Sequence, residues 1–185
     1  MLGAALTTRD PRIGEIYLSE SEILKRVGEL GAEIEADYAG RDLVLVTVLT
    51  GAVIFVSDLA RAIRLPLGMD FVALAAYDGR LGGRTSIRIL KDLDAPIAGR
   101  DVLVVEDVVD TGLTLNYLLR AFALREPRDL AVCTLLDRPY RRLVDDLPMR
   151  YVGFSVPDEF FVGYGFDLGE RYRGLRDLRV VEQRR

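Results

Sequence analysis

The stretch VLVVEDVVDTGLTL, residues 102–115, decides the fold of this chain. Its first residues, Val102 to Val105, are aliphatic and run directly into two adjacent acids, Glu106 and Asp107. An apolar run bounded in this way is typical of a strand buried on both faces of a parallel sheet. Ligands of such sheets bind beyond the carboxyl ends of the strands, so we expect the acids at a ligand-binding edge.

The residues after the two acids have the composition of a phosphate-binding turn. Residues 110–114, Asp-Thr-Gly-Leu-Thr, lead into a helix predicted from Gly112 to Leu124. Unpaired amides at the start of a helix, together with threonine hydroxyls, suit a phosphate. Acids beside a phosphate repel it unless a divalent cation or a sugar diol lies between them. The plain alternative is a buried strand followed by a solvated acidic turn and a helix cap.

The rest of the chain alternates predicted strands and helices. Ser19 to Glu22 forms a capping box that opens a helix, which ends at Gly40. Further strands are predicted at residues 43–49, 69–76, 87–90 and 130–136, with a further helix at residues 52–63. This alternation predicts a right-handed, mainly parallel α/β sheet. The region from Tyr151 onward is rich in strands and loops, which indicates a smaller cap.

Length and composition narrow the class of protein. The 185 residues, half of them hydrophobic and 29% charged, predict one globular domain over residues 1–185. Its core is expected at residues 40–140, with a cap at residues 150–181 plus the N-terminal segment. The net charge of -4 argues against nucleic acid as a partner. No window reaches the roughly 18 apolar residues of a membrane span, and no signal peptide is evident, so a cytoplasmic location is expected.

Two residue types limit the chemistry. The chain has no histidine, which excludes Ser-His-Asp and Cys-His catalysis and leaves proton transfer to Asp, Glu, Lys, Tyr or Cys. Its one cysteine, Cys133, lies in an apolar run and is interpreted as a core thiol.

Residues 102–115 resemble the phosphoribosyl-diphosphate signature of the type I phosphoribosyltransferases: a hydrophobic strand, two acids, two aliphatic residues and Asp-Thr-Gly-x-Thr. With an acid at Asp110, the stretch looks like the hypoxanthine-guanine branch of that family. The resemblance covers residues 43–181. It implies the type I phosphoribosyltransferase fold, a central mainly parallel sheet flanked by helices, with a small strand-rich cap from the C-terminal region.

The resemblance implies that this signature grips a ribose that carries phosphate groups. Glu106 and Asp107 would hold the ribose hydroxyls and help to position Mg²⁺, which binds through few carboxylates plus substrate oxygens. Asp110 would be the general base that takes a proton from purine N7. The 5′-phosphate would be bound by the loop of Asp110, Thr111, Gly112, Leu113 and Thr114.

Two further segments match loops of the family. Thr50 and Gly51 match its short pyrophosphate loop, which often contains a non-proline cis peptide. Ala76 and Tyr77 open the segment 77–86, which matches a flexible lid over the reacting centre. Such a lid makes sense because water would capture an oxocarbenium-like sugar.

The family's purine site and its remaining ligands match residues nearer the C-terminus. Phe160 would stack on the base, Phe161 would present backbone groups to it, and Arg138 would donate to its 6-oxo group. Asp167, in the same purine-binding cap, matches an acid that holds a second magnesium, and Arg173 an arginine that meets pyrophosphate. Taken singly, the aromatic pair is core filler, and Asp167 and Arg173 form a surface ion pair.

Three positions depart from the family pattern. Thr50 stands where a lysine is usual, Ala76 where a serine is usual, and Arg138 where a lysine contacts the purine 6-oxo group. Arginine still donates to a carbonyl, but it is longer and planar. A 6-oxopurine therefore remains the expected substrate class, while the preference among hypoxanthine, guanine and xanthine stays open.

The resemblance implies purine salvage: phosphoribosyl diphosphate and a purine base would give IMP or GMP and pyrophosphate, in a homodimer or homotetramer. Alternatives are a xanthine-preferring enzyme, an orotate or pyrimidine transferase, and a non-catalytic regulator that senses nucleotides and binds RNA. Asp110 argues against the regulator, since such proteins commonly lose the acidic base. Arg138, Arg141 and Arg142 form the only compact basic cluster, and Arg141 and Arg142 are interpreted as a solvated or subunit-interface patch.

Overall fold

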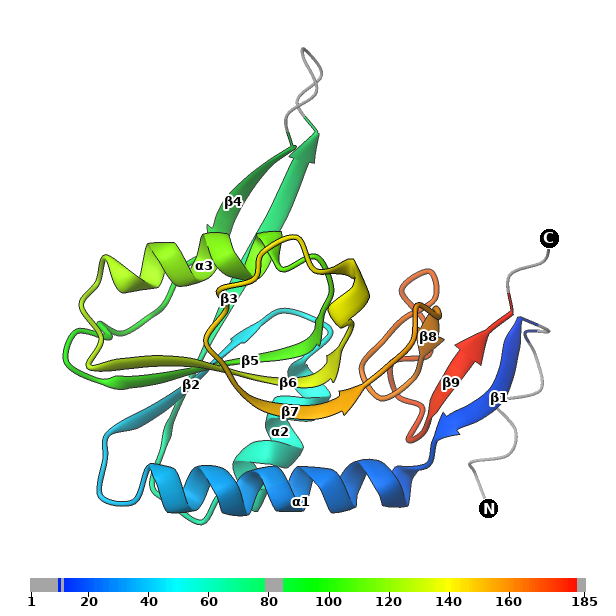
Figure 1. Ribbon diagram of the computed structural model, residues 1–185, viewed down its shortest axis with the longest axis horizontal. Helices are drawn as coiled ribbons and strands as arrows, with labels where there is room; N and C mark the ends of the chain where they lie inside the picture. Colours follow the sequence, from blue (N-terminus) through cyan, green and yellow to red (C-terminus); the bar gives the residue numbers. More distant parts are fainter. Residues whose placement is uncertain (1–9, 11, 79–84, 183–185) are drawn as a thin grey trace.

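A computed structural model describes residues 10, 12–78 and 85–182 (Figure 1). The elements are β1 (Ile13–Leu18), α1 (Glu20–Asp37), β2 (Leu43–Val48), α2 (Val53–Ala62), β3 (Gly68–Asp78), β4 (Thr85–Lys91), β5 (Asp101–Val109), α3 (Leu113–Ala123), β6 (Asp129–Asp137), the 3-10 helix η1 (Pro139–Arg141), β7 (Met149–Ser155), β8 (Phe161–Val162) and β9 (Leu178–Val181). None of the helices in this part of the chain combines the length and the apolar character needed to span a bilayer.

The main sheet has six strands in the order β4-β3-β2-β5-β6-β7. All neighbours pair in parallel except β3 and β4, which pair antiparallel. Figure 1 shows α3 on one face of this sheet and α1 and α2 on the other. The mainly parallel α/β sheet predicted from the sequence is confirmed.

Burial on both faces explains the continuous apolar runs of the central strands. In β5, Leu103 and Val105 pack in the core beneath α1 and α2, while Val102 and Val104 pack in the core beneath α3. Strands covered by helices on both sides need apolar residues at every position, not at alternate ones. Cys133 of β6 is fully buried in the first core, and burial raises the pKa of its thiol. It is the core thiol that its sequence context predicted.

The capping box predicted for the first helix is present. Ser19 Oγ accepts a hydrogen bond from the Glu22 amide at 3.3 Å, and a Glu22 carboxylate oxygen accepts one from the Ser19 amide at 2.8 Å. Such a cap contributes about 1 kcal/mol to a helix. It fixes where α1 begins, directly after β1.

A second, three-stranded sheet has the order β1-β9-β8 and joins the two ends of the chain. Figure 1 shows it beyond the carboxyl end of β7. β7 itself, which sequence reasoning counted with the cap from Tyr151 onward, belongs to the main sheet, where it pairs with β6. There α1 packs against it: Tyr151 of β7 lies in the same core as the buried residues of α1, and Arg26 donates hydrogen bonds to the carbonyls of Val152 and Gly153 at 2.9 and 3.2 Å.

Candidate active site

The two adjacent acids lie inside β5 and not beyond its end, which corrects the sequence expectation. The pairing of β5 with β2 stops at Val105, but its pairing with β6 continues to Val109. At Glu106 and Asp107, β5 therefore has no pairing with β2 on one side, while on its other side it still pairs with β6. Because successive side chains alternate in a strand, the two carboxylates face opposite sides of the sheet edge.

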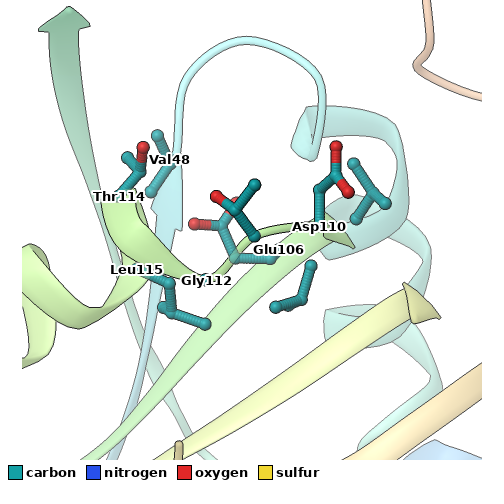
Figure 2. Close-up of a pocket in the computed structure, with 9 residues that line it drawn as sticks. Val48, Glu106, Asp110, Gly112, Thr114 and Leu115 are labelled. Atoms are coloured by element: carbon teal, nitrogen blue, oxygen red, sulfur yellow. The ribbon is translucent and has the colours of Figure 1, made fainter. Parts of the chain in front are cut away.

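A pocket of about 190 Å³ lies where β5 turns into α3. Its lining comprises Val48, Glu106, Val108, Val109, Asp110, Thr111, Gly112, Thr114 and Leu115. Figure 2 shows Glu106, Asp110 and Thr114 around this space, with Val48 of β2 at its side. The structure thus brings together five of the residues expected to hold the sugar and its 5′-phosphate. Of the other two, Leu113 is half exposed and Asp107 lies against the loop after β2.

The turn before α3 requires glycine at position 112. Gly112 has a φ of +80°, and a Cβ there would also approach Leu147 Cδ1 to 2.9 Å. Gly112 is the N-cap of α3 and makes no side-chain cap, so the first amides of the helix lack a side-chain acceptor. Such a helix start, with the hydroxyls of Thr111 and Thr114 beside it, suits an anion with several oxygens.

Glu106 and Asp107, here called the acidic rim, form no ion pair with a described residue, although the charge of Arg173 acts to lower the pKa of Asp107. Burial and the neighbouring Asp107 raise the pKa of Glu106 well above its ordinary value. Burial also raises the pKa of Asp107, against the opposing effect of a hydrogen bond from the Val108 amide at 2.7 Å. Within the described ranges, Glu106 has no hydrogen-bond or ion-pair partner. A ligand that brings hydroxyl donors or positive charge would relieve both carboxylates.

These donors fit Mg²⁺ only in part. Mg²⁺ takes one or two protein carboxylates and fills its other positions with water and substrate oxygens, and because Glu106 and Asp107 face opposite sides, one of them would meet that need. Asp167 is engaged: one of its oxygens pairs with Arg173 at 2.8 Å and the other accepts the Glu170 amide at 2.8 Å. In the described chain, no group of three or more potential ligands is placed to hold a metal unaided. The residues therefore fit a magnesium ion that takes its remaining ligands from a substrate and from water.

The expected pyrophosphate loop lies beside the rim. The peptide bond between Leu49 and Thr50 is cis, as the resemblance implied. Gly51 touches two other segments, because a Cβ on it would overlap the Asp107 carboxylate, and a Cβ on Gly165 would overlap the Gly51 carbonyl. The loop after β2 is thus packed between the acidic rim and the segment after β8.

Arg173 is tied to that same segment. Its guanidinium donates to the Gly165 carbonyl at 2.8 Å and pairs with Asp167. The ion pair between Asp167 and Arg173, the plain alternative for these two residues, is therefore present. Because Gly165 also packs against the Gly51 carbonyl, Arg173 lies next to the loop after β2.

Of the residues expected around a purine, Arg138 and Phe161 lie together next to Asp110, whereas Asp167 pairs with Arg173. Arg138 donates a hydrogen bond to the Glu159 carbonyl, and its guanidinium carbon lies 5.6 Å from the centre of the Phe161 ring. Phe160 is 44% exposed, so its ring is available to a ligand, whereas Phe161 is buried. Sequence reasoning missed Tyr17 of β1, whose ring centre is 4.8 Å from that of Phe161. Only the pairing of β1 with β9 brings it there, and no local pattern signals that pairing.

Buried polar atoms without a hydrogen bond gather around Asp110, the residue expected to act as general base. In the part of the chain that the structure describes, four buried side-chain polar atoms lack a hydrogen bond. One is Thr47 Oγ1 in the core; the others are Asp110 Oδ1, Arg138 Nε and Arg142 Nε. Arg138 Nη1 lies 4.0 Å from Asp110 Oδ2. Two neighbouring side chains thus each carry a buried polar atom that makes no hydrogen bond, a donor on Arg138 and an acceptor on Asp110.

Sequence reasoning interpreted Arg141 and Arg142 as a solvated or subunit-interface patch, and of the two only Arg141 is exposed. The Arg142 side chain is only 13% exposed and pairs with Asp137. Arg141 is half exposed, but its Nε lies 3.2 Å from Asp110 Oδ1. Both arginines therefore belong to the surroundings of the site, and adjacent arginines after a strand give no sequence signal for that role.

The lid expectation falls largely outside the described residues. Ala76 and Tyr77 lie near the end of β3, paired with Ile87 and Ser86 of β4. Residues 79–84 of the segment are not described.

Comparison with known proteins gives the same family throughout. Residues 14–168 match the model of the phosphoribosyl transferase domain. The hypoxanthine-guanine phosphoribosyltransferase of Mycobacterium avium is 47% identical, over 99% of this chain and 96% of the relative. The crystal structure of a hypoxanthine-guanine phosphoribosyltransferase from Bacillus anthracis, with a HEPES molecule in its active site, is 41% identical and superposes with a TM-score of 0.86, over 93% of this chain and 99% of that one.

A third comparison concerns a complex. The hypoxanthine phosphoribosyltransferase of Trypanosoma cruzi, solved with the product IMP, is 37% identical with a TM-score of 0.86, over 94% of this chain and 96% of that one. Near-complete coverage in both directions leaves no large part of the chain outside the match. With its signature loop, acidic rim and β1-β9-β8 cap, this chain belongs to the phosphoribosyltransferase family, among the hypoxanthine-guanine phosphoribosyltransferases of purine salvage.

Proposed function

We propose that the protein transfers the 5-phosphoribosyl group of phosphoribosyl diphosphate to hypoxanthine or guanine, giving IMP or GMP and pyrophosphate. The observation that carries the choice of purine is that neither Arg138 Nε nor Asp110 Oδ1 makes a hydrogen bond, while the two side chains approach each other to 4.0 Å. Buried polar atoms of this kind cost free energy until a ligand satisfies them. The exposed ring of Phe160 offers an aromatic surface nearby.

A 6-oxopurine satisfies both atoms at once. Its edge presents a carbonyl oxygen, which accepts from Arg138, next to an N7–H group, which donates to Asp110. Adenine would present an amino group where the carbonyl is needed, so two donors would face each other and both would stay unpaired. The names of the relatives, which specify hypoxanthine or guanine, support the same class of base.

The proposed reaction follows from these positions. Purine N9 bonds to the anomeric carbon as the bond from that carbon to pyrophosphate breaks, and the N7 proton passes to Asp110. Glu106 and Asp107 hold the ribose hydroxyls, while the amides and hydroxyls of residues 110–114 hold the 5′-phosphate. When bound, Mg²⁺ would neutralise charge on the pyrophosphate. The departing pyrophosphate would be contacted by Thr50 and Gly51 in the loop after β2 and by Arg173 in the segment after β8.

The test is an assay of four bases, hypoxanthine, guanine, xanthine and adenine, each with phosphoribosyl diphosphate and with or without Mg²⁺. We expect Mg²⁺-dependent release of pyrophosphate, with nucleotide formed from hypoxanthine or guanine and none from adenine. Release with xanthine alone would favour the xanthine-preferring alternative. Binding of nucleotide without any turnover would favour a regulator and would overturn the proposal.

Asp110→Asn separates chemistry from binding. We expect turnover to fall by about 100-fold or more, because a general base contributes on that scale, while IMP binding stays largely intact. Asp146→Asn, which changes an exposed acid of the segment between η1 and β7, is the matched control. Unchanged turnover in Asp110→Asn would remove Asp110 from its role. A homodimer or homotetramer remains the expectation for the assembly, to be measured by sedimentation.

A further inference from the structure

Arg141 connects Asp110, the proposed general base, to the loop before Phe160. Its Nε lies 3.2 Å from Asp110 Oδ1, and its Nη1 donates to Asp158 Oδ1 at 3.2 Å. Asp158 lies in the short loop between β7 and β8, two residues before Phe160. One side chain therefore spans from the end of the signature strand to the aromatic side of the purine site.

The contact with Asp110 leaves that carboxylate able to accept a hydrogen bond. Although Arg141 Nε is at ion-pair distance from Asp110 Oδ1, the two atoms do not make a hydrogen bond, so this oxygen can still accept one. Asp110 also shares its edge of the sheet with the acids Glu106 and Asp107. A cation beside it offsets that repulsion without using the oxygen that a purine N–H would need.

The backbone presents Arg141 in a fixed way. Residues 138–143 are pinned at both ends to the turn after β5, because the Arg138 amide donates to the Val109 carbonyl at 3.0 Å and the Leu143 amide donates to the Thr111 carbonyl at 2.9 Å. Between these anchors, Arg141 closes η1, a single 3-10 turn. A tethered turn costs its arginine less ordering than a free surface loop would.

We propose that Arg141 is a positioning residue, which holds the Asp110 carboxylate and the loop of Asp158 at the separation that a purine ring needs. The inference rests on the proposed function and deepens it. Arg141 does not touch the reacting atoms; it acts through Asp110 and through the loop that carries Phe160.

The main test uses Arg141→Gln, which removes the charge and keeps a polar side chain. We expect kcat to fall roughly tenfold and the KM for the purine to rise, because the Asp110 carboxylate is displaced but still present. The KM for phosphoribosyl diphosphate should change less than that for the purine, since Asp110 is the one described residue of the 5′-phosphate loop that the Arg141 side chain contacts. Arg141→Lys should restore part of the activity, because an ammonium keeps the charge but cannot span both acids.

Coupling and controls separate this role from a general effect on folding. Asp158→Asn should lower kcat less than Arg141→Gln does, and the double variant should be no worse than Arg141→Gln alone. Arg64→Gln, which breaks a pair between Glu35 and an arginine that is 81% exposed, should match the unchanged protein in every constant.

The outcomes distinguish this inference from the proposed function. If the unchanged protein forms no nucleotide from any purine, the proposed function fails and the role of Arg141 fails with it. If that protein is active and Arg141→Gln behaves like Arg64→Gln, only the role of Arg141 is overturned. An equal rise of both KM values together with a lower melting temperature would also overturn it, because that pattern indicates a structural role.

Discussion

Gly51 lies so close to Asp107 that a Cβ at this position would overlap the Asp107 carboxylate. The contact joins the loop after β2 to the part of β5 that extends past β2. On its other side, the Gly51 carbonyl occupies the space that a Cβ of Gly165 would take. Gly51 is therefore the position at which three segments meet: the acids of β5, the loop after β2 and the segment after β8. Only a hydrogen atom fits there as a side chain.

Gly51→Ala tests that meeting point. The added methyl must push Asp107 aside or shift the loop, and we expect kcat/KM for phosphoribosyl diphosphate to fall by about 100-fold, the scale of a misplacement of about 1 Å. Gly28→Ala is the control, because Gly28 lies in α1 with open space where its Cβ would be. That variant should keep full activity and gain up to about 1 kcal/mol of stability. Equal kinetics in the two variants would refute the argument.

Glu106→Gln should lower turnover and raise the stability of the ligand-free protein. Glu106 is held at the rim without a partner among the described residues, and burial and Asp107 disfavour its charged form. A neutral side chain of similar shape removes that cost, so the free energy of unfolding of the ligand-free protein should rise at neutral pH. Turnover should fall roughly tenfold or more, since a charge-assisted hydrogen bond to the ribose is lost.

Chemical denaturation without ligand and steady-state kinetics together check the Glu106 prediction. Glu15→Gln, at an exposed position of β1, is the control and should change neither quantity. A ligand-free Glu106→Gln protein that is less stable than the unchanged protein would show that Glu106 has a structural partner.

Features set by short stretches of sequence could be predicted, and those set by distant contacts could not. The apolar run of β5, the capping box at Ser19 and the burial of Cys133 each depend on a few neighbouring residues. Their physics is local: two buried faces require apolar side chains throughout, and an N-cap needs an oxygen at one position.

The site residues missed by sequence reasoning lie at long-range contacts. Tyr17 reaches Phe161 only because the two ends of the chain pair in one sheet. Arg141 reaches Asp110 only because the segment after β6 folds back on the turn after β5. The extra length of β5 has the same origin, since pairing with β6, and not composition, carries the strand past its two acids.

Arg138→Lys should change the preference among purines. The Arg138 guanidinium lies near the Phe161 ring and binds the Glu159 carbonyl, and it still has Nε free. A lysine has one ammonium for these contacts, so its reach to the purine carbonyl and the shape of the site must differ. We expect the ratio of kcat/KM for hypoxanthine to that for guanine to shift by about threefold or more.

Competition assays with mixed bases measure that ratio directly. Arg120→Lys, which changes an exposed arginine of α3, should leave the ratio unchanged. A ratio that is also unchanged in Arg138→Lys would mean that Arg138 does not contact the base.

Asp129 stabilises the amino-terminal edge of the main sheet, opposite the site. Both oxygens of its carboxylate accept hydrogen bonds from Arg150, at 2.6 and 3.0 Å, and the Tyr38 hydroxyl donates a third at 3.0 Å. These contacts, that of Arg150 foremost, lower the pKa of Asp129 from 3.8 to about 2. Since the folded state favours the ionised form, the stabilisation is fully present above the unfolded value and disappears as pH falls from 3.8 toward 2.

Asp129→Asn should therefore lower the free energy of unfolding by about 2 kcal/mol at neutral pH, with little change in KM for either substrate. The deficit relative to the unchanged protein should shrink in acid, because that protein loses the same contribution as Asp129 is protonated. Urea denaturation at several pH values measures it, with Asp94→Asn as the control at an acid whose side chain is 81% exposed. A deficit that stays constant across this range would assign the loss to packing and not to the charge of Asp129.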